Sequence, residues 1–312
     1  MIWLQILAYA GIGVFVLVTL LKFVRYSTMP LHLRWELYPV PHEKYRAEHG
    51  GSYYEEPEWW KKPIETTFLG ELKEMLMEML FIKREFEHNR SLWYFSFPFH
   101  AGIYLMLFWF FLIFASAISY VAGLGNIENL AMGLAKVVGI AGMILLTVGC
   151  AGLFVRRISD RKLRTYSSAS DYFNLLFILS VVLTGFYAWR VDPNFSIAKT
   201  FAASLVTFTP LNTELPAAVT LHTALLSVLV AYIPTTKMSH YVAKYFTYHQ
   251  ILWEDHPNIG MSPLREKIKE VLSYKVKWSA PHIREDLTWA EEATTIEPIL
   301  QIKAIEERRR KR

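Results

Sequence analysis

The chain has 312 residues, of which 53% are hydrophobic and 15% aromatic, a composition that is rare in a soluble domain of this length. The single cysteine, Cys150, excludes a disulfide framework and any cysteine-rich iron–sulfur or zinc site within the chain. The net charge of +5 comes from Lys and Arg that concentrate in particular loops, which indicates membrane topology rather than nucleic-acid binding.

Five stretches of the sequence are long and apolar enough to cross a membrane, which takes roughly 20 residues. We expect them at about 3–24, 92–122, 130–155, 172–189 and from 216 toward 240. The first stretch lacks the basic leading region and the cleavage site of a signal peptide, so it is predicted to be a retained span. The predicted fold class is therefore all-α, a polytopic membrane protein with a bundle of five transmembrane helices.

Positive charges predict the orientation of this bundle, because loops rich in Lys and Arg stay in the cytoplasm. The loops after the first and third spans are rich in both residues, whereas the turn at 123–129 has neither. We therefore expect the N-terminus outside and the C-terminus inside a cytoplasmic membrane. The predicted parts are a first span at 1–24, a cytoplasmic loop at 25–90, the other four spans at 91–250 and a cytoplasmic tail at 251–312.

Three segments outside the spans have patterns of their own. Apolar residues between 68 and 80 recur at helical spacing, which predicts an amphipathic helix whose apolar face lies on the bilayer or against a partner subunit. Residues 195–211 are apolar but too short to span, so we expect an interfacial or re-entrant segment. The basic cluster at 308–312 is expected to be solvated or to face lipid headgroups.

Three of the ten histidines, His100, His222 and His240, lie in or beside apolar spans, where an ionisable side chain is costly and marks a functional site. In one continuous helix His222 and His240 would share a face and lie about 27 Å apart. The second and fifth spans run in opposite directions, so His100 and His240 are both expected near the inner surface. Two imidazoles at one depth on facing helices are suited to ligate the iron of a haem b.

His222 is expected nearer the outer surface, where the second span offers no histidine. Lys136 on the third span is the strong nitrogen donor at a similar depth. Three roles stay open for it: second axial ligand of an outer haem, hydrogen-bond donor to a quinone or a haem propionate, or a lysine that extends outward to the membrane surface. Met132 and Met143 are further possible ligands, although methionine in an apolar helix is usually a packing residue.

Several motifs of the chain resemble a known family. They are 99–103 around His100, the spacing of His222 and His240 followed by 241–245, and the basic segment 156–171. Together they resemble the respiratory nitrate reductase gamma subunit, a five-span dihaem cytochrome b. The loop sequences are similar to the branch found in transmembrane redox complexes of sulfate-reducing anaerobes, such as the DsrM, Hme and Tmc cytochrome subunits. These loop sequences are 33–39, 50–53, 70–74 and 87–90.

The resemblance implies that His100 and His240 ligate an inner haem and that His222 is one ligand of an outer haem. The family's second histidine on the second span would fall near Phe110 and is absent here, so an outer haem needs a substitute such as Lys136. The resemblance also implies electron transfer between menaquinol and a cytoplasmic iron–sulfur subunit similar to heterodisulfide reductase. An extracytoplasmic multihaem cytochrome c often accompanies such complexes.

The predicted function is that of a haem b-containing membrane subunit of a respiratory complex, which serves anaerobic respiration and is not catalytic alone. It transfers electrons between the quinone pool and the iron–sulfur partner, while the redox chemistry belongs to the cofactors. The alternative is a haem-free membrane anchor or transporter in which the histidines and Lys136 relay protons or bind a substrate. The sequence leaves the direction of electron flow and the number of haems open.

Overall fold

The computed structural model describes residues 1–29, 41, 43–45, 55–63, 65–249, 253, 262–278, 280 and 283–294. Within these residues the structure is helical, and the only β-type pairings are two isolated bridges. The loop motifs at 33–39 and 50–53 and the basic cluster at 308–312 lie outside the described residues. The chain divides into two compact units, one of residues 1–21 and 68–240 and one of residues 22–67 and 241–312.

Five helices are long and apolar enough to cross a membrane, as the sequence predicts. They are α1 (Ile2–Thr28), α5 (Arg90–Val121), α6 (Gly125–Ser159), α8 (Ala169–Val191) and α10 (Ala217–Tyr232), the last extended by the turn η3 (Ile233–Thr235). Large apolar side chains such as Phe111 and Val137 are mostly exposed on them. Such a surface is stable against lipid but not in water.

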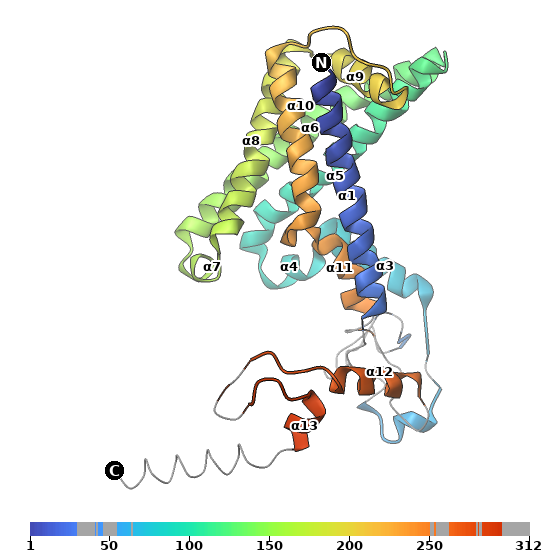
Figure 1. Ribbon diagram of the computed structural model, residues 1–312, viewed down its shortest axis with the longest axis vertical. Coiled ribbons are helices and arrows are strands. Elements are labelled where there is room, and N and C mark those ends of the chain that lie inside the picture. Colours follow the sequence, from blue (N-terminus) through green and yellow to red (C-terminus); the bar gives the residue numbers. More distant parts are fainter. Residues whose placement is uncertain are drawn as a thin grey trace. The chain divides into compact units, whose positions relative to one another are not determined.

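Polar residues determine where the helices begin at one end of the bundle, where α4 (Lys83–His88) and α7 (Arg161–Thr165) lie (Figure 1). Asn89 caps α5 by accepting from the Leu92 amide, and Asp160 caps α7. Ser168 and Asp171 form a capping box at the start of α8. Each cap satisfies backbone amides that the first helical turn leaves without a partner.

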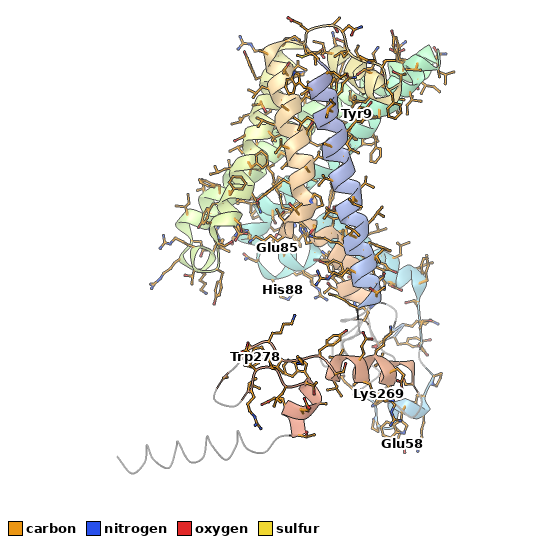
Figure 2. All side chains as sticks on the ribbon, in the orientation of Figure 1. Tyr9, Glu58, Glu85, His88, Lys269 and Trp278 are labelled. Atoms are coloured by element: carbon orange, nitrogen blue, oxygen red, sulfur yellow. The ribbon has the colours of Figure 1, made fainter. Side chains whose placement is uncertain are left out.

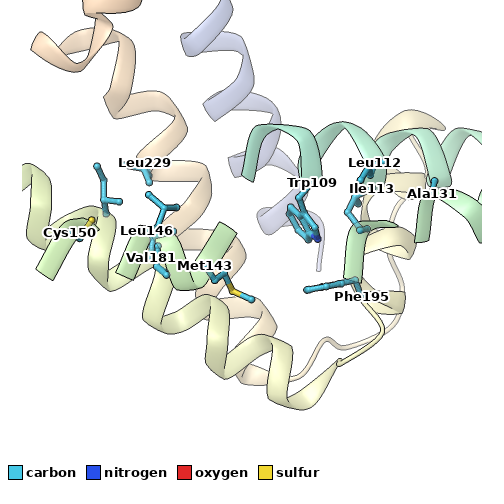
Figure 3. Close-up of a cluster of buried hydrophobic side chains, with 14 of the residues drawn as sticks. Trp109, Leu112, Ile113, Ala131, Met143, Leu146, Cys150, Val181, Phe195 and Leu229 are labelled. Carbon is cyan, nitrogen blue, oxygen red and sulfur yellow. The ribbon is translucent and has the colours of Figure 1, made fainter. Parts of the chain in front are cut away.

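The core of the bundle is built on the close pairing of α5 and α6. A Cβ added at Gly149 would lie 2.5 Å from the Phe99 backbone, and one at Gly102 would lie 2.7 Å from the Leu146 amide nitrogen. Glycine at these positions therefore lets the two backbones approach, as small residues do between membrane helices. Side chains of α6 and α8 and Leu229 of α10 belong to the same buried cluster (Figure 3).

At the opposite end, α9 (Ser196–Val206) occupies the segment for which the sequence predicts an interfacial or re-entrant stretch. Its connection to α10 is held by α1. The buried Gln5 amide donates to Ser204 Oγ at 3.0 Å and to the Thr209 carbonyl at 2.8 Å, and its oxygen accepts from the Leu211 amide at 3.1 Å. Gln5 thus satisfies two backbone groups of the loop, which have no water to bind in a membrane, and also contacts Ser204 of α9.

The expectation of one continuous fifth helix as far as His240 is wrong. Helix α10 ends at Tyr232, and two 3-10 turns, η3 and η4 (Lys237–Ser239), follow before α11 (His240–Thr247) begins. Pro234 has no amide hydrogen and cannot continue the helical hydrogen bonding, and Thr236 is extended with φ −115° and ψ −178°. The argument that His222 and His240 share one helix face therefore does not hold.

A helix, α3 (Phe68–Phe81), lies where the apolar spacing predicts one. It is fixed to α5 by the Trp93 indole, which donates to the Phe81 carbonyl at 2.7 Å, and by the Tyr104 hydroxyl, which donates to the Met79 carbonyl at 2.5 Å. In the second unit, Phe246 of α11 packs edge-on against Phe23 and Tyr26 of the last turns of α1. That unit also holds η2 (Trp59–Lys61), α12 (Pro263–Leu272) and α13 (Trp289–Thr294).

Candidate functional site

The structure brings His100 and His240 together. His100 lies three turns into α5 and is partly buried, whereas His240 is exposed at the start of α11. The centres of their imidazole rings are 6.3 Å apart, and the ring planes are inclined by 76°. The predicted proximity of these residues from two separate segments is therefore present, although His240 begins α11 instead of ending the fifth span.

Backbone carbonyls fix the tautomer of both rings. His100 Nδ1 lies 2.7 Å from the Ser96 carbonyl oxygen, and His240 Nδ1 lies 3.3 Å from that of Lys237. A carbonyl oxygen can only accept, so each Nδ1 carries a hydrogen, and in a neutral imidazole Nε2 is then the nitrogen with the lone pair. This is the arrangement of metal-binding histidines, in which the second nitrogen donates to a carbonyl and orients the ring.

The ring separation suits a shared metal ion. A metal–imidazole bond is about 2 Å long, and the nitrogen lies roughly 1 Å from the ring centre, so two imidazoles on opposite sides of one metal have centres about 6 Å apart. His88 provides a comparison, because its Nδ1 also lies 2.9 Å from a carbonyl oxygen, that of Arg84. His88 is exposed and is not paired with another imidazole in the described residues. The proximity of a second imidazole therefore distinguishes His100 and His240 from His88.

His222 lies apart from this pair, between α10 and α8. Its Nδ1 donates to the Val181 carbonyl at 3.2 Å, which again leaves Nε2 with a lone pair. The ring packs closely against α8 at residue 185, which is glycine. A Cβ there would lie 3.2 Å from His222 Cε1 and 3.4 Å from Met143 Sδ. The imidazole and the buried thioether of Met143 therefore meet over one point of α8.

Lys136 lies on α6 seven residues before Met143, which places it about 10 Å farther toward the α9 end of the bundle. Within the described part of the chain it makes no hydrogen bond or ion pair. One turn along α6, a Cβ at Gly139 would lie 2.9 Å from Nε1 of Trp109, a buried indole nitrogen that also has no hydrogen-bond partner in the described residues. Lys136 of α6 and the Trp109 indole of α5 thus lie at neighbouring turns of α6, and neither has a hydrogen-bond acceptor in the described residues.

Sequence reasoning did not identify Glu85 and Ser96 as part of this region. The Ser96 hydroxyl donates to Glu85 Oε2, and the Ser96 carbonyl accepts from His100. Ser96 is 6% exposed. A serine four residues before a histidine in an apolar helix is one signal that was available, because residues i and i+4 lie on one face. Nothing in the sequence connects Glu85, 11 residues from Ser96, with that face.

Comparisons with known proteins agree with this picture. The family model described as nitrate reductase gamma subunit matches residues 84–253, more than half of the chain. A curated relative from Archaeoglobus profundus, named Hdr-like menaquinol oxidoreductase cytochrome b-like subunit, is 28% identical over 166 residues. That alignment covers 51% of this chain and 49% of the relative, so the chain spans about half the length of the curated relative it matches. No solved structure matches the chain.

Proposed function

The chain belongs to the nitrate reductase gamma subunit family, and from this membership we propose that it is a haem b-carrying membrane subunit of a quinone-linked respiratory complex. The observation that carries the proposal is the pair His100 and His240, whose ring centres are 6.3 Å apart. In both rings Nδ1 donates to a backbone carbonyl, so in the neutral imidazole Nε2 is the nitrogen available to bind iron.

In this proposal His100 and His240 would hold the iron of a first haem b, which would supply one-electron chemistry. His222 would be one ligand of a second haem b, with Lys136 or Met143 as the candidate second ligand. The glycine at position 185 supports His222 in that role, since it allows close packing of the imidazole ring against α8.

Quinone is the proposed redox substrate within the membrane. The printed name of the curated relative describes it as a menaquinol oxidoreductase subunit, which supports menaquinone as the quinone. Lys136 and the Trp109 indole supply two hydrogen-bond donors that have no acceptor in the described residues, and quinone carbonyls are acceptors. A role as quinone-binding donors is compatible with burial of the Trp109 ring among apolar side chains.

Partners and orientation stay predictions. The basic loop after α6 supports a cytoplasmic location for the end of the bundle with α4, α7 and the His100–His240 pair. A cytoplasmic iron–sulfur subunit that is similar to heterodisulfide reductase is proposed to exchange electrons there, in line with the "Hdr-like" name of the relative. An extracytoplasmic multihaem cytochrome c is the further partner that the family resemblance predicts.

The test is a reduced-minus-oxidised spectrum of the purified full-length protein together with a pyridine haemochrome measurement. We expect the α-band of a b-type haem, and we expect His100→Ala and His240→Ala to lose the same spectral component. His88→Ala is the matched control, because its Nδ1 has the same kind of carbonyl contact but faces no second imidazole in the described residues. A wild-type protein without haem, prepared from cells that load other b cytochromes, would refute the proposal.

A further inference from the structure

Glu85 on α4, labelled in Figure 2, contacts Ser96 of α5, which lies four residues before His100. The buried Ser96 hydroxyl donates to Glu85 Oε2. The carbonyl of the same Ser96 accepts from His100 Nδ1 at 2.7 Å. One serine therefore connects the carboxylate to the imidazole, without direct contact between Glu85 and His100.

The surroundings of Glu85 disfavour its negative charge. Burial of the side chain, and then the neighbouring Glu78 carboxylate on α3, raise the pKa of Glu85 above its ordinary value of 4.5. The Lys83 ammonium on α4 is held by Glu74 of α3 at 2.7 Å, and Glu78 accepts from the Arg84 amide at 2.9 Å.

Other charged groups near this position point elsewhere or are solvated. Glu87 and His88 of α4 are exposed, and His88 Nδ1 lies against the Arg84 carbonyl. On α5, the Arg90 guanidinium stacks on the Phe86 ring at 4.4 Å. On the same helix, the Tyr104 hydroxyl donates to the Met79 carbonyl of α3, and the His100 ring lies 6.3 Å from that of His240. On the His240 side, the Asp171 carboxylate is paired with Lys237. Glu85 is the carboxylate that one residue, Ser96, links to His100.

We propose that Glu85 is a proton-binding group coupled to the redox state of the His100–His240 site. The proposal rests on the proposed function, in which a haem occupies that site and a quinol supplies its electrons. Glu85 takes up one proton from the adjacent aqueous phase for each electron that reaches the site, and it releases that proton when the electron leaves. Charge is thereby balanced, because an added negative charge nearby makes a half-buried carboxylate harder to ionise.

The measurement is a potentiometric titration of the haem at the His100–His240 site in the purified full-length protein, repeated over a series of pH values. This haem is identified as the spectral component that disappears in His240→Ala. In wild type the midpoint potential is expected to fall with rising pH over a window above pH 4.5. For a one-electron couple that binds one proton, a tenfold change in proton concentration changes the midpoint potential by at most about 59 mV.

Three variants separate the roles. Glu85→Gln keeps the shape of the side chain and an acceptor for Ser96, so it should fold and bind haem but lose this pH dependence. Glu87→Gln, two positions away on the exposed side of α4, should retain it. Ser96→Ala removes a donor that favours the ionised carboxylate, so the window should shift to higher pH.

A pH dependence that is the same in wild type and Glu85→Gln would overturn the inference while the haem assignment stands. A potential that does not vary with pH in wild type would overturn it as well. Absence of haem from the wild-type protein would refute the proposed function and this inference with it, and the spectrum taken before titration distinguishes that outcome from the other two.

Discussion

Replacing Gly149 by alanine tests whether the close approach of α5 and α6 positions His100. The new Cβ would lie 2.5 Å from the Phe99 nitrogen and Cα, whereas ordinary contacts begin at 3.4 Å. Helix α5 must therefore move away from α6 by about 1 Å at the residue next to His100. Because the obstacle is backbone rather than a flexible side chain, the cost is that of an overpacked core, about 1–3 kcal/mol.

The matched control is Gly133→Ala on the same helix, where a Cβ would meet nothing within 4 Å. Both variants gain the same helix propensity, so the difference in unfolding free energy between them isolates the overpacking. Thermal unfolding in detergent should give a lower Tm for Gly149→Ala than for Gly133→Ala, and the spectral component that depends on His100 should weaken in Gly149→Ala alone. Equal Tm values and equal spectra would refute the reasoning that this contact determines the position of His100.

Three further predictions follow from other contacts. We expect His222→Ala to lose the spectral component of the second haem. Of Met143→Leu and Lys136→Ala, the variant that removes the second ligand should change the spin state and midpoint potential of that haem, and the other should not. If neither spectrum changes, both residues are excluded as ligands. The ion pair of Lys199 and Glu128, at 2.5 Å with side chains that are 17% and 18% exposed, should show a coupling of about 1–3 kcal/mol in a double-mutant cycle of thermal unfolding, and no coupling would contradict it. The raised pKa of Glu85 means that the folded chain binds this proton more tightly than the unfolded chain, so stability is lost as pH rises through the window above 4.5. The Tm advantage of Glu85→Gln over wild type should grow across that window, and an advantage that stays constant with pH would argue against it.

The five spans and the pairing of His100 with His240 could be predicted from sequence, for a physical reason. Membrane helices can be recognised by their length and apolar composition. A histidine within or beside such a run is unusual, so it can be identified as a candidate functional residue. The amphipathic spacing at 68–80 likewise identified α3.

What the sequence did not provide depends on tertiary packing and on local breaks. Pro234 was visible, but its effect on the helix before His240 depends on how Thr236 and the following turn are arranged. The approach of Met143 to His222 depends on Gly185, which belongs to a third helix. Glu85 reaches Ser96 because α4 folds back on α5 at Asn89, and no periodic pattern encodes such a reversal.

Because the helix breaks after α10, the two imidazoles of the pair are held in position by different parts of the structure. His100 is built into a helix whose backbone is pressed against α6, so it has little freedom to shift. His240 is the first residue of α11, beyond two short turns, so a movement of α11 would reach that imidazole directly through the peptide backbone. The two sides of the pair therefore differ in how their position is set: His100 by helix packing, and His240 by the place where α11 begins.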